Sequence, residues 1–239
     1  MESLKGKTAI VTGASSGIGR ATALAFAQAG VNVVVTARRE QRLAELCEEI
    51  KALGAGAEFY AGDAAEQTTA IACVEMAVAE FGGLDILVNN AGLGNYKLLV
   101  DTSVEEYDEL MNANMRSGFV FSRHAAPVMI EQESGVILFI SSVAGLQGTP
   151  NEAVYCATKF AQAGFAQAID GELRKHGVKV GTIYSGGVKS EFAVGHGRTE
   201  ESVKASRMMA PEEVAETILF ACSLPANVRI PAMTVRHMG

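Results

Sequence analysis

Residues 8–19 read Thr-Ala-Ile-Val-Thr-Gly-Ala-Ser-Ser-Gly-Ile-Gly, and this stretch decides the fold. The short run Thr8–Val11 predicts a strand, and apolar residues at helical spacing predict a helix over Gly17–Ala29. The turn between them needs residues without a Cβ wherever its backbone approaches phosphate or packs against the sheet. The start of the helix then offers free N–H groups and the positive end of its dipole to a pyrophosphate. The stretch therefore predicts a dinucleotide-binding unit.

The same pattern, a short strand followed by a helix, repeats along the chain. The other expected strands are Asn32–Thr36, Glu58–Ala61, Leu84–Asn89, Gly135–Ile140 and Val178–Tyr184. The other expected helices are Glu40–Leu53, Thr68–Phe81, Ser103–Glu133, Val154–His176 and a last one that begins at Pro211. Several strands are almost wholly apolar, as parallel strands covered on both faces are. This alternation predicts an α/β fold with a doubly wound, Rossmann-like parallel sheet. Because no linker or repeat interrupts it, we expect a single domain over residues 1–239.

Composition excludes several other classes of protein. The chain has 239 residues, is 49% hydrophobic and carries a net charge of -7. The apolar fraction excludes disorder, and the acidic balance argues against a nucleic-acid or anionic-membrane partner. The longest apolar runs, such as Val136–Ile140, fall far short of the roughly 18 residues that a membrane span needs. The chain start runs directly into the first strand, so we expect no signal peptide and a cytoplasmic protein. No metal site is expected, because the cysteines lack metal-binding spacing; they are Cys47, Cys73, Cys156 and Cys222.

The glycine-rich turn allows two other interpretations, the nucleophile turn of a hydrolase and a purely structural turn. Its spacing is G-x-x-x-G-x-G, and no Lys follows, as a P-loop would require. The same letters satisfy G-x-S-x-G, which would make Ser15 the nucleophile of an esterase. That alternative is disfavoured because the turn follows the first strand, so no earlier strand and loop can supply a second oxyanion donor. No Asp-then-His pair stands out downstream either.

The end of the second expected strand bears on cofactor selectivity. An acidic residue there would hold the ribose hydroxyls of NAD, but the chain has Arg38 and Arg39 instead. Guanidinium groups bind phosphate bidentately, so these residues favour NADP, with NAD still possible. The alternative is that both arginines merely occupy an exposed helix start.

A reactive set lies in the second half of the chain. Tyr155 and Lys159 are four residues apart, which places both on one helix face. A neighbouring ammonium is expected to lower the phenol pKa from its free value of about 10 and so permit acid–base work. Ser141 and Ser142 follow the fifth expected strand, where a hydroxyl could bind a substrate carbonyl. Taken singly, each of these residues, and Asn114 likewise, could be an ordinary surface or turn residue.

Taken together, these motifs resemble the single-domain branch of the short-chain dehydrogenase/reductase family over essentially the whole chain. Residues 12–19 match its T-G-x-x-x-G-I-G motif, residues 89–92 match N-N-A-G, and Asp63 matches an acid that contacts adenine. The resemblance implies the catalytic set Asn114, Ser142, Tyr155 and Lys159. Counting the arginines above, the expected cofactor-binding residues are Gly13, Ser15, Ser16, Gly17, Ile18, Gly19, Arg38, Arg39, Asp63, Asn90, Ala91, Gly92, Tyr155, Lys159, Gly186, Val188 and Ser190. The chain departs from the family at residues 185–188, where Ser-Gly-Gly-Val replaces the usual Pro-Gly.

The resemblance also implies a mechanism. Tyr155 would exchange a proton with the oxygen of a carbonyl or alcohol substrate while hydride passes between its carbon and nicotinamide. Lys159 would hold the nicotinamide ribose and lower the Tyr155 pKa. Ser142 would orient the carbonyl, and Asn114 would place a water in a proton relay. A second hypothesis is a non-catalytic NADP-binding regulator on the same scaffold, disfavoured because all four reactive positions are intact.

Substrate choice is expected in the region of about residues 186–210, which carries His196, Arg198 and Arg207 and resembles a lid. Basic residues there suit a carboxylate, although they could equally be solvated charges. Residues 224–236 resemble members that act on small 3-hydroxy acids or serine-like substrates. A homodimer or homotetramer is expected, since the family pairs the helix that here carries small residues at Ala157, Ala161, Gly164 and Ala168.

Overall fold

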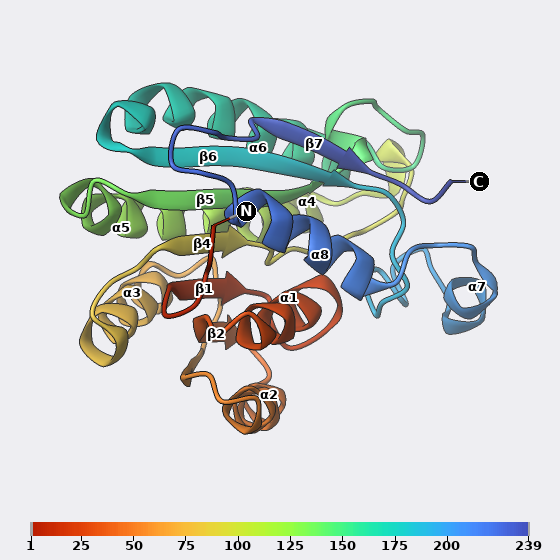
Figure 1. The fold of residues 1–239 in the computed structure, drawn as a ribbon. Helices are drawn as coiled ribbons and strands as arrows, with labels where there is room; N and C mark the ends of the chain where they lie inside the picture. The colour runs from red at the N-terminus through yellow and green to blue at the C-terminus, as the bar shows by residue number, and fades with distance from the viewer. Residues whose placement is uncertain (1, 239) are drawn as a thin grey trace.

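The computed structural model describes residues 2–238, which form a seven-stranded parallel sheet with helices on both faces (Figure 1). The strands are β1 (Thr8–Thr12), β2 (Asn32–Ala37), β3 (Ala57–Ala61), β4 (Ile86–Asn89), β5 (Gly135–Ser142), β6 (Val178–Ser185) and β7 (Ala232–Val235). The helices are α1 (Gly17–Gln28), α2 (Glu40–Ala52), α3 (Gln67–Phe81), α4 (Val104–Met111), α5 (Ser117–Glu131), α6 (Ala153–Leu173), α7 (Glu200–Ala205) and α8 (Pro211–Cys222). The predicted α/β, Rossmann-like fold is confirmed.

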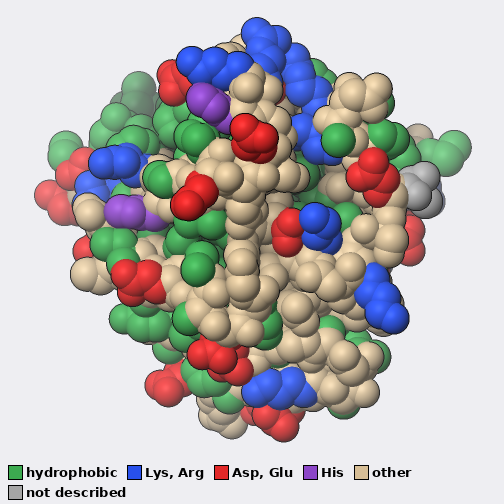
Figure 2. Space-filling model, turned by 60° about the vertical axis from the view of Figure 1, so that its left-hand side comes forward, with side chains coloured by type: hydrophobic (Ala, Val, Ile, Leu, Met, Phe, Trp, Pro, Cys, Tyr) green, Lys and Arg blue, Asp and Glu red, His purple; other side chains and the backbone are tan. Residues whose placement is uncertain are grey.

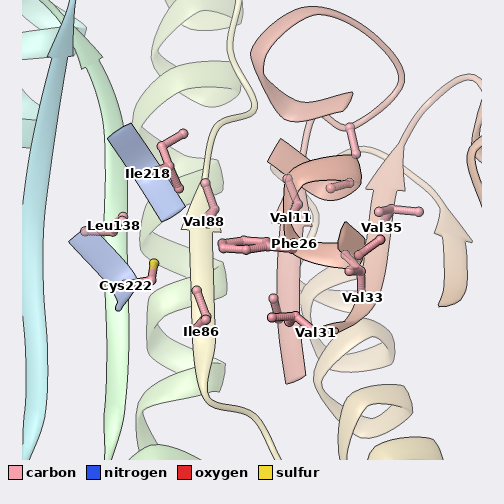
Figure 3. Close-up of a cluster of buried hydrophobic side chains, with 14 of the residues drawn as sticks. Val11, Phe26, Val31, Val33, Val35, Ile86, Val88, Leu138, Ile218 and Cys222 are labelled. Carbon is pink, nitrogen blue, oxygen red and sulfur yellow. The ribbon is translucent and has the colours of Figure 1, made fainter. Parts of the chain in front are cut away.

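Two apolar layers hold the helices to the sheet. On one face, α1, α2 and α8 pack against it, and Figure 3 shows the Phe26 ring lying between Val11 and Val88. On the other face, α3, α5 and α6 contribute the buried side chains, among them Phe121 and Met129. Both faces of the central strands are therefore removed from water, which is why those strands read as nearly continuous apolar runs.

The strand order places a crevice between β1 and β4. The order is β3-β2-β1-β4-β5-β6-β7, so the chain fills one half of the sheet and then crosses to the other. The ends of β1 and β4 are joined by the Thr12 hydroxyl, which accepts hydrogen bonds from the backbone N–H groups of Asn90 at 3.0 Å and Ala91 at 2.9 Å. In sheets of this kind, ligands bind outside the carboxyl ends of the strands at such a reversal.

Some predicted elements differ from the structure. The single helix expected over Ser103–Glu133 is wrong, because a π-helical turn at Asn112–Arg116 separates α4 from α5. β5 runs on through Ser141 and Ser142, so these serines end the strand rather than follow it. Neither α7 nor β7 is predicted from the sequence, since α7 has only six residues and β7 is a half-exposed edge strand of four.

In Figure 2, several Lys and Arg side chains gather along the top of the face shown, while acidic and further basic side chains are scattered over the rest of it among hydrophobic groups. Across residues 2–238, we find no helix with the length and apolar character that crossing a membrane requires. All four cysteines are free and buried, and burial raises the thiol pKa of Cys73 and of Cys222 to about 12.

Candidate active site

A cavity of about 930 Å³ runs along the carboxyl edge of the sheet, from the glycine-rich turn to Tyr155. The structure brings all the expected site residues to its walls except Gly19 and Asn114, which lie behind the lining. Arg198 and His196 also line the cavity, whereas Arg207 is exposed and lies outside it. Residues that are far apart in the sequence thus share one space.

The glycines of the turn are required by close backbone contacts. Gly13 and Gly17 have φ of 66° and 56°, a region that side chains with a Cβ rarely adopt. A Cβ on Gly13 would lie 2.9 Å from the Ala91 Cα, and one on Gly19 would lie 2.5 Å from the Asn90 Nδ2. The turn therefore packs directly against the end of β4 and leaves its outer side to the cavity.

The Arg39 guanidinium forms a corner at one end of the cavity, which we call the Arg39 corner. Its Nη2 donates to the Ser15 Oγ at 2.9 Å and to the Ser16 Oγ at 2.8 Å, while its Nη1 donates to Glu191 at 2.7 Å. The Ser15 hydroxyl thus faces a guanidinium, and none of its hydrogen bonds within residues 2–238 involves an imidazole. A serine nucleophile needs a neighbouring base, so this geometry does not support the esterase alternative.

Tyr155 lies at the other end of the cavity between two aromatic rings. Its ring centroid is 5.9 Å from that of Tyr96 and 5.8 Å from that of Phe192. Burial raises the pKa of the Tyr155 phenol and Tyr96 adds to the rise, whereas a hydrogen bond with the Ser142 side chain lowers it. The direction is opposite to the expected one because desolvation outweighs every favourable charge at this position.

Lys159 is buried beside Tyr155, with its Nζ 5.7 Å from the ring centroid. The ammonium donates to the Ile140 carbonyl at 3.0 Å and to the Gln162 Oε1 at 3.1 Å. Burial lowers its pKa to about 8. Two neutral acceptors therefore hold the amine, and its pKa of about 8 means that it can lose its proton slightly above neutral pH.

Asn114 positions a loop of the cavity wall. Its amide donates to the Leu93 carbonyl at 3.0 Å and to the Thr158 Oγ1 at 2.9 Å, and its Oδ1 accepts from the Leu93 N–H at 2.6 Å. Its backbone carbonyl accepts from the Gln162 amide at 2.7 Å. The side chain is thus fully engaged by protein groups, and a water-placing role for Asn114 stays a prediction.

The cavity fits a dinucleotide that carries an extra phosphate. The cavity extends from the start of α1 at Gly17 to Tyr155, and the glycines of the turn leave no side chains in its way. At the Arg39 corner, a guanidinium and two serine hydroxyls lie together. These are the groups that bind pyrophosphate and a phosphate monoester.

Comparison with known protein families gives a match over most of the chain. The family model described as short chain dehydrogenase matches residues 7–201.

The chain belongs to the short-chain dehydrogenase family.

Relatives of this short-chain dehydrogenase match it over nearly its whole length. An uncharacterized oxidoreductase of Thermotoga maritima is 36% identical over 228 residues, covering 91% of this chain and 90% of the relative. An alcohol dehydrogenase from the archaeon Thermococcus sibiricus, solved with 5-hydroxy-NADP, is 26% identical with a TM-score of 0.87 and 97% of each chain covered. The closed form of a serine dehydrogenase complexed with NADP+ is 30% identical with a TM-score of 0.89, covering 96% of this chain and 94% of that one. This short-chain dehydrogenase is thus an oxidoreductase.

Sequence reasoning missed several residues of the site. Tyr96, Glu152, Glu191 and Phe192 line the cavity, and Gln162 holds Lys159 from behind. Glu191 and Phe192 lie within the predicted substrate region of about residues 186–210, although neither was singled out there as a site residue. The others depend on which distant segments pack together, which no local pattern in this short-chain dehydrogenase encodes.

Proposed function

We propose that this short-chain dehydrogenase transfers a hydride between the nicotinamide of NADP and the carbonyl carbon of a small 3-oxo acid, interconverting it with the 3-hydroxy acid. The observation that carries the proposal is one continuous cavity. It joins the Arg39 corner at one end to Ser142, Tyr155 and Arg198 at the other.

Several contacts support NADP as the cofactor. Arg39, with the Ser15 and Ser16 hydroxyls, supplies three donors within reach of one phosphate, as a 2′-phosphate requires. The start of α1 would hold the pyrophosphate, and Asp63 lines the adenine side. Gly186, Val188 and Ser190 would lie beside the nicotinamide. Two solved relatives are complexes with NADP+ or a derivative of NADP, which agrees with this assignment.

The proton chemistry would belong to Tyr155. When bound, the nicotinamide supplies or accepts the hydride. In reduction, the C=O π electrons move to oxygen, the Tyr155 phenol gives its proton to that oxygen, and the Ser142 hydroxyl donates a hydrogen bond to it. The raised pKa keeps the phenol protonated, which is the state that reduction needs. The phenolate left behind is stabilised by the neighbouring Lys159 ammonium, and oxidation runs the same steps in reverse.

Arg198 is the proposed partner of the substrate carboxylate. It is half-buried, and its Cζ lies 5.2 Å from the Tyr96 ring centroid and 5.9 Å from that of Phe192. These are the two rings that pack against Tyr155, so an acid group bound by Arg198 would leave a nearby carbonyl beside the phenol. A guanidinium pairs with carboxylate through charge-assisted hydrogen bonds.

The test compares Arg198→Met with Arg207→Met in NADPH-dependent reduction of a small 3-oxo acid and of its methyl ester. We expect Arg198→Met to raise KM for the acid by about tenfold or more and to leave KM for the ester unchanged. Arg207→Met should change neither value, because Arg207 lies outside the cavity. Wild-type preference for steroid or sugar carbonyls over the 3-oxo acid would contradict the substrate assignment.

We also propose a homodimer or homotetramer that acts in the cytoplasm. Ala157, Gly164 and Ala168 leave an exposed, low-relief stripe along α6, and the exposed Phe160 lies beside it. Small residues of this kind allow two helices to approach closely.

A further inference from the structure

Glu191 places a carboxylate inside the Arg39 corner. It follows β6 in the chain, yet its Oε2 accepts from the Arg39 Nη1 at 2.7 Å on the far side of the cavity. Both of its oxygens also accept from the Arg42 Nη1 at 2.9 Å. The Nε and Nη2 groups of Arg39 donate to the hydroxyls of Ser15 and Ser16. Four of the five N–H groups of the Arg39 guanidinium are therefore already directed to oxygen atoms of the protein.

A carboxylate and a phosphate monoester have the same requirements at such a site. Both are oxygen anions that a guanidinium binds through parallel N–H donors. Two anions cannot share one guanidinium edge without repulsion, and the phosphate carries the greater charge. The Glu191 side chain is 56% exposed, so water can take over its hydrogen bonds when it leaves. The pair between Arg39 and Glu191 is thus exchangeable rather than locked in the core.

We infer that Glu191 is a specificity-determining residue, whose carboxylate competes with the cofactor 2′-phosphate for Arg39 and so sets the preference between NADP and NAD. The inference rests on the proposed use of NADP. It follows that a ligand with a 2′-phosphate must displace Glu191, whereas one without that phosphate leaves the pair with Arg39 intact. Glu191 therefore reduces the difference in affinity between NADP and NAD that Arg39 alone would produce.

Cofactor fragments test this directly, without turnover. The affinities of 2′,5′-ADP and 5′-AMP for wild type and Glu191→Gln are measured by isothermal titration calorimetry. The amide keeps the shape of the side chain and removes its charge. We expect 2′,5′-ADP to bind about three- to tenfold more tightly to Glu191→Gln, and 5′-AMP to bind equally to both proteins.

Two further variants make the test specific. Glu45→Gln removes a negative charge from the neighbouring helix α2 without touching Arg39, since Glu45 accepts from Gln41 instead. It should leave 2′,5′-ADP binding unchanged. In an Arg39→Met background, Glu191→Gln should leave the affinity for 2′,5′-ADP unchanged, because the guanidinium for which Glu191 and the phosphate compete is absent.

Three outcomes would overturn the inference. Unchanged or weaker 2′,5′-ADP binding by Glu191→Gln would mean that Glu191 orients Arg39 for phosphate. Equal tightening by Glu45→Gln would reveal only a general effect of net charge. Both outcomes would leave the NADP assignment standing, provided wild type binds 2′,5′-ADP more tightly than 5′-AMP. If wild type shows no such difference, the NADP assignment fails together with this inference.

Discussion

At the scale of the residue, Lys159 makes stability depend on pH. Burial lowers its pKa from 10.5 to about 8, so between these values the unfolded chain binds more protons than the folded protein. Stability rises with pH wherever the unfolded state binds more protons, so the cost of the buried charge is full below about pH 8 and disappears toward pH 10.5.

Comparison with Lys159→Met isolates this effect. We expect the free energy of unfolding of wild type, minus that of Lys159→Met, to increase by up to about 3 kcal/mol between pH 7 and pH 10. Urea unfolding followed by circular dichroism at a series of pH values measures the difference. A difference that stays flat or falls over this range would show that Lys159 keeps its ordinary pKa in the folded protein.

The residue scale is also where sequence reasoning reached its limit. Spacing placed Tyr155 and Lys159 on one helix face, because helical geometry is local. It could not give the direction of the Tyr155 pKa, which depends on burial by Tyr96 and Phe192 from other segments. The sequence predicts that the Lys159 ammonium lies near Tyr155. Desolvation has the larger effect on the Tyr155 pKa, and it depends on the tertiary structure.

At the scale of the element, the π-helical turn at Asn112–Arg116 shows how a local irregularity serves the site. Apolar periodicity predicts one continuous helix there, because an extra residue in one turn changes that pattern very little. Within the turn, Asn114 reaches both Leu93 and Thr158, and these hydrogen bonds offset the irregular backbone. Such a turn is decided by distant partners and therefore escapes prediction.

Helix α6 carries the prediction about assembly. A Cβ on Gly164 would meet nothing within 4 Å, so Gly164→Arg should fold as well as wild type while blocking close approach of a second helix. We expect light scattering to give a dimer or tetramer for wild type and a smaller mass for Gly164→Arg. Ala52→Arg, at an exposed position of α2 on the other face of the sheet, serves as the control and should keep the wild-type mass. A monomeric wild type, or an unchanged mass for Gly164→Arg, would contradict this.

At the scale of the whole molecule, the fold was largely accessible from the sequence. Alternating strands and helices, joined by right-handed crossovers, leave few topologies, and the doubly wound sheet is the one found. The edge strand β7 was not predicted, because its four residues are only half-buried and form no apolar run. The cavity follows from the same topology, since the reversal between β1 and β4 gathers the strand ends on one edge.

The central claim is that the Tyr155 phenol carries the proton to and from substrate. The most direct test is Tyr155→Phe, measured as kcat/KM for NADPH-dependent reduction of a small 3-oxo acid together with the Kd for NADPH. We predict that kcat/KM falls by about 10²- to 10⁴-fold, whereas the Kd rises by no more than the roughly tenfold that one lost hydrogen bond to the cofactor would cost. Turnover that survives at the wild-type level, with the cofactor still bound, would contradict the claim.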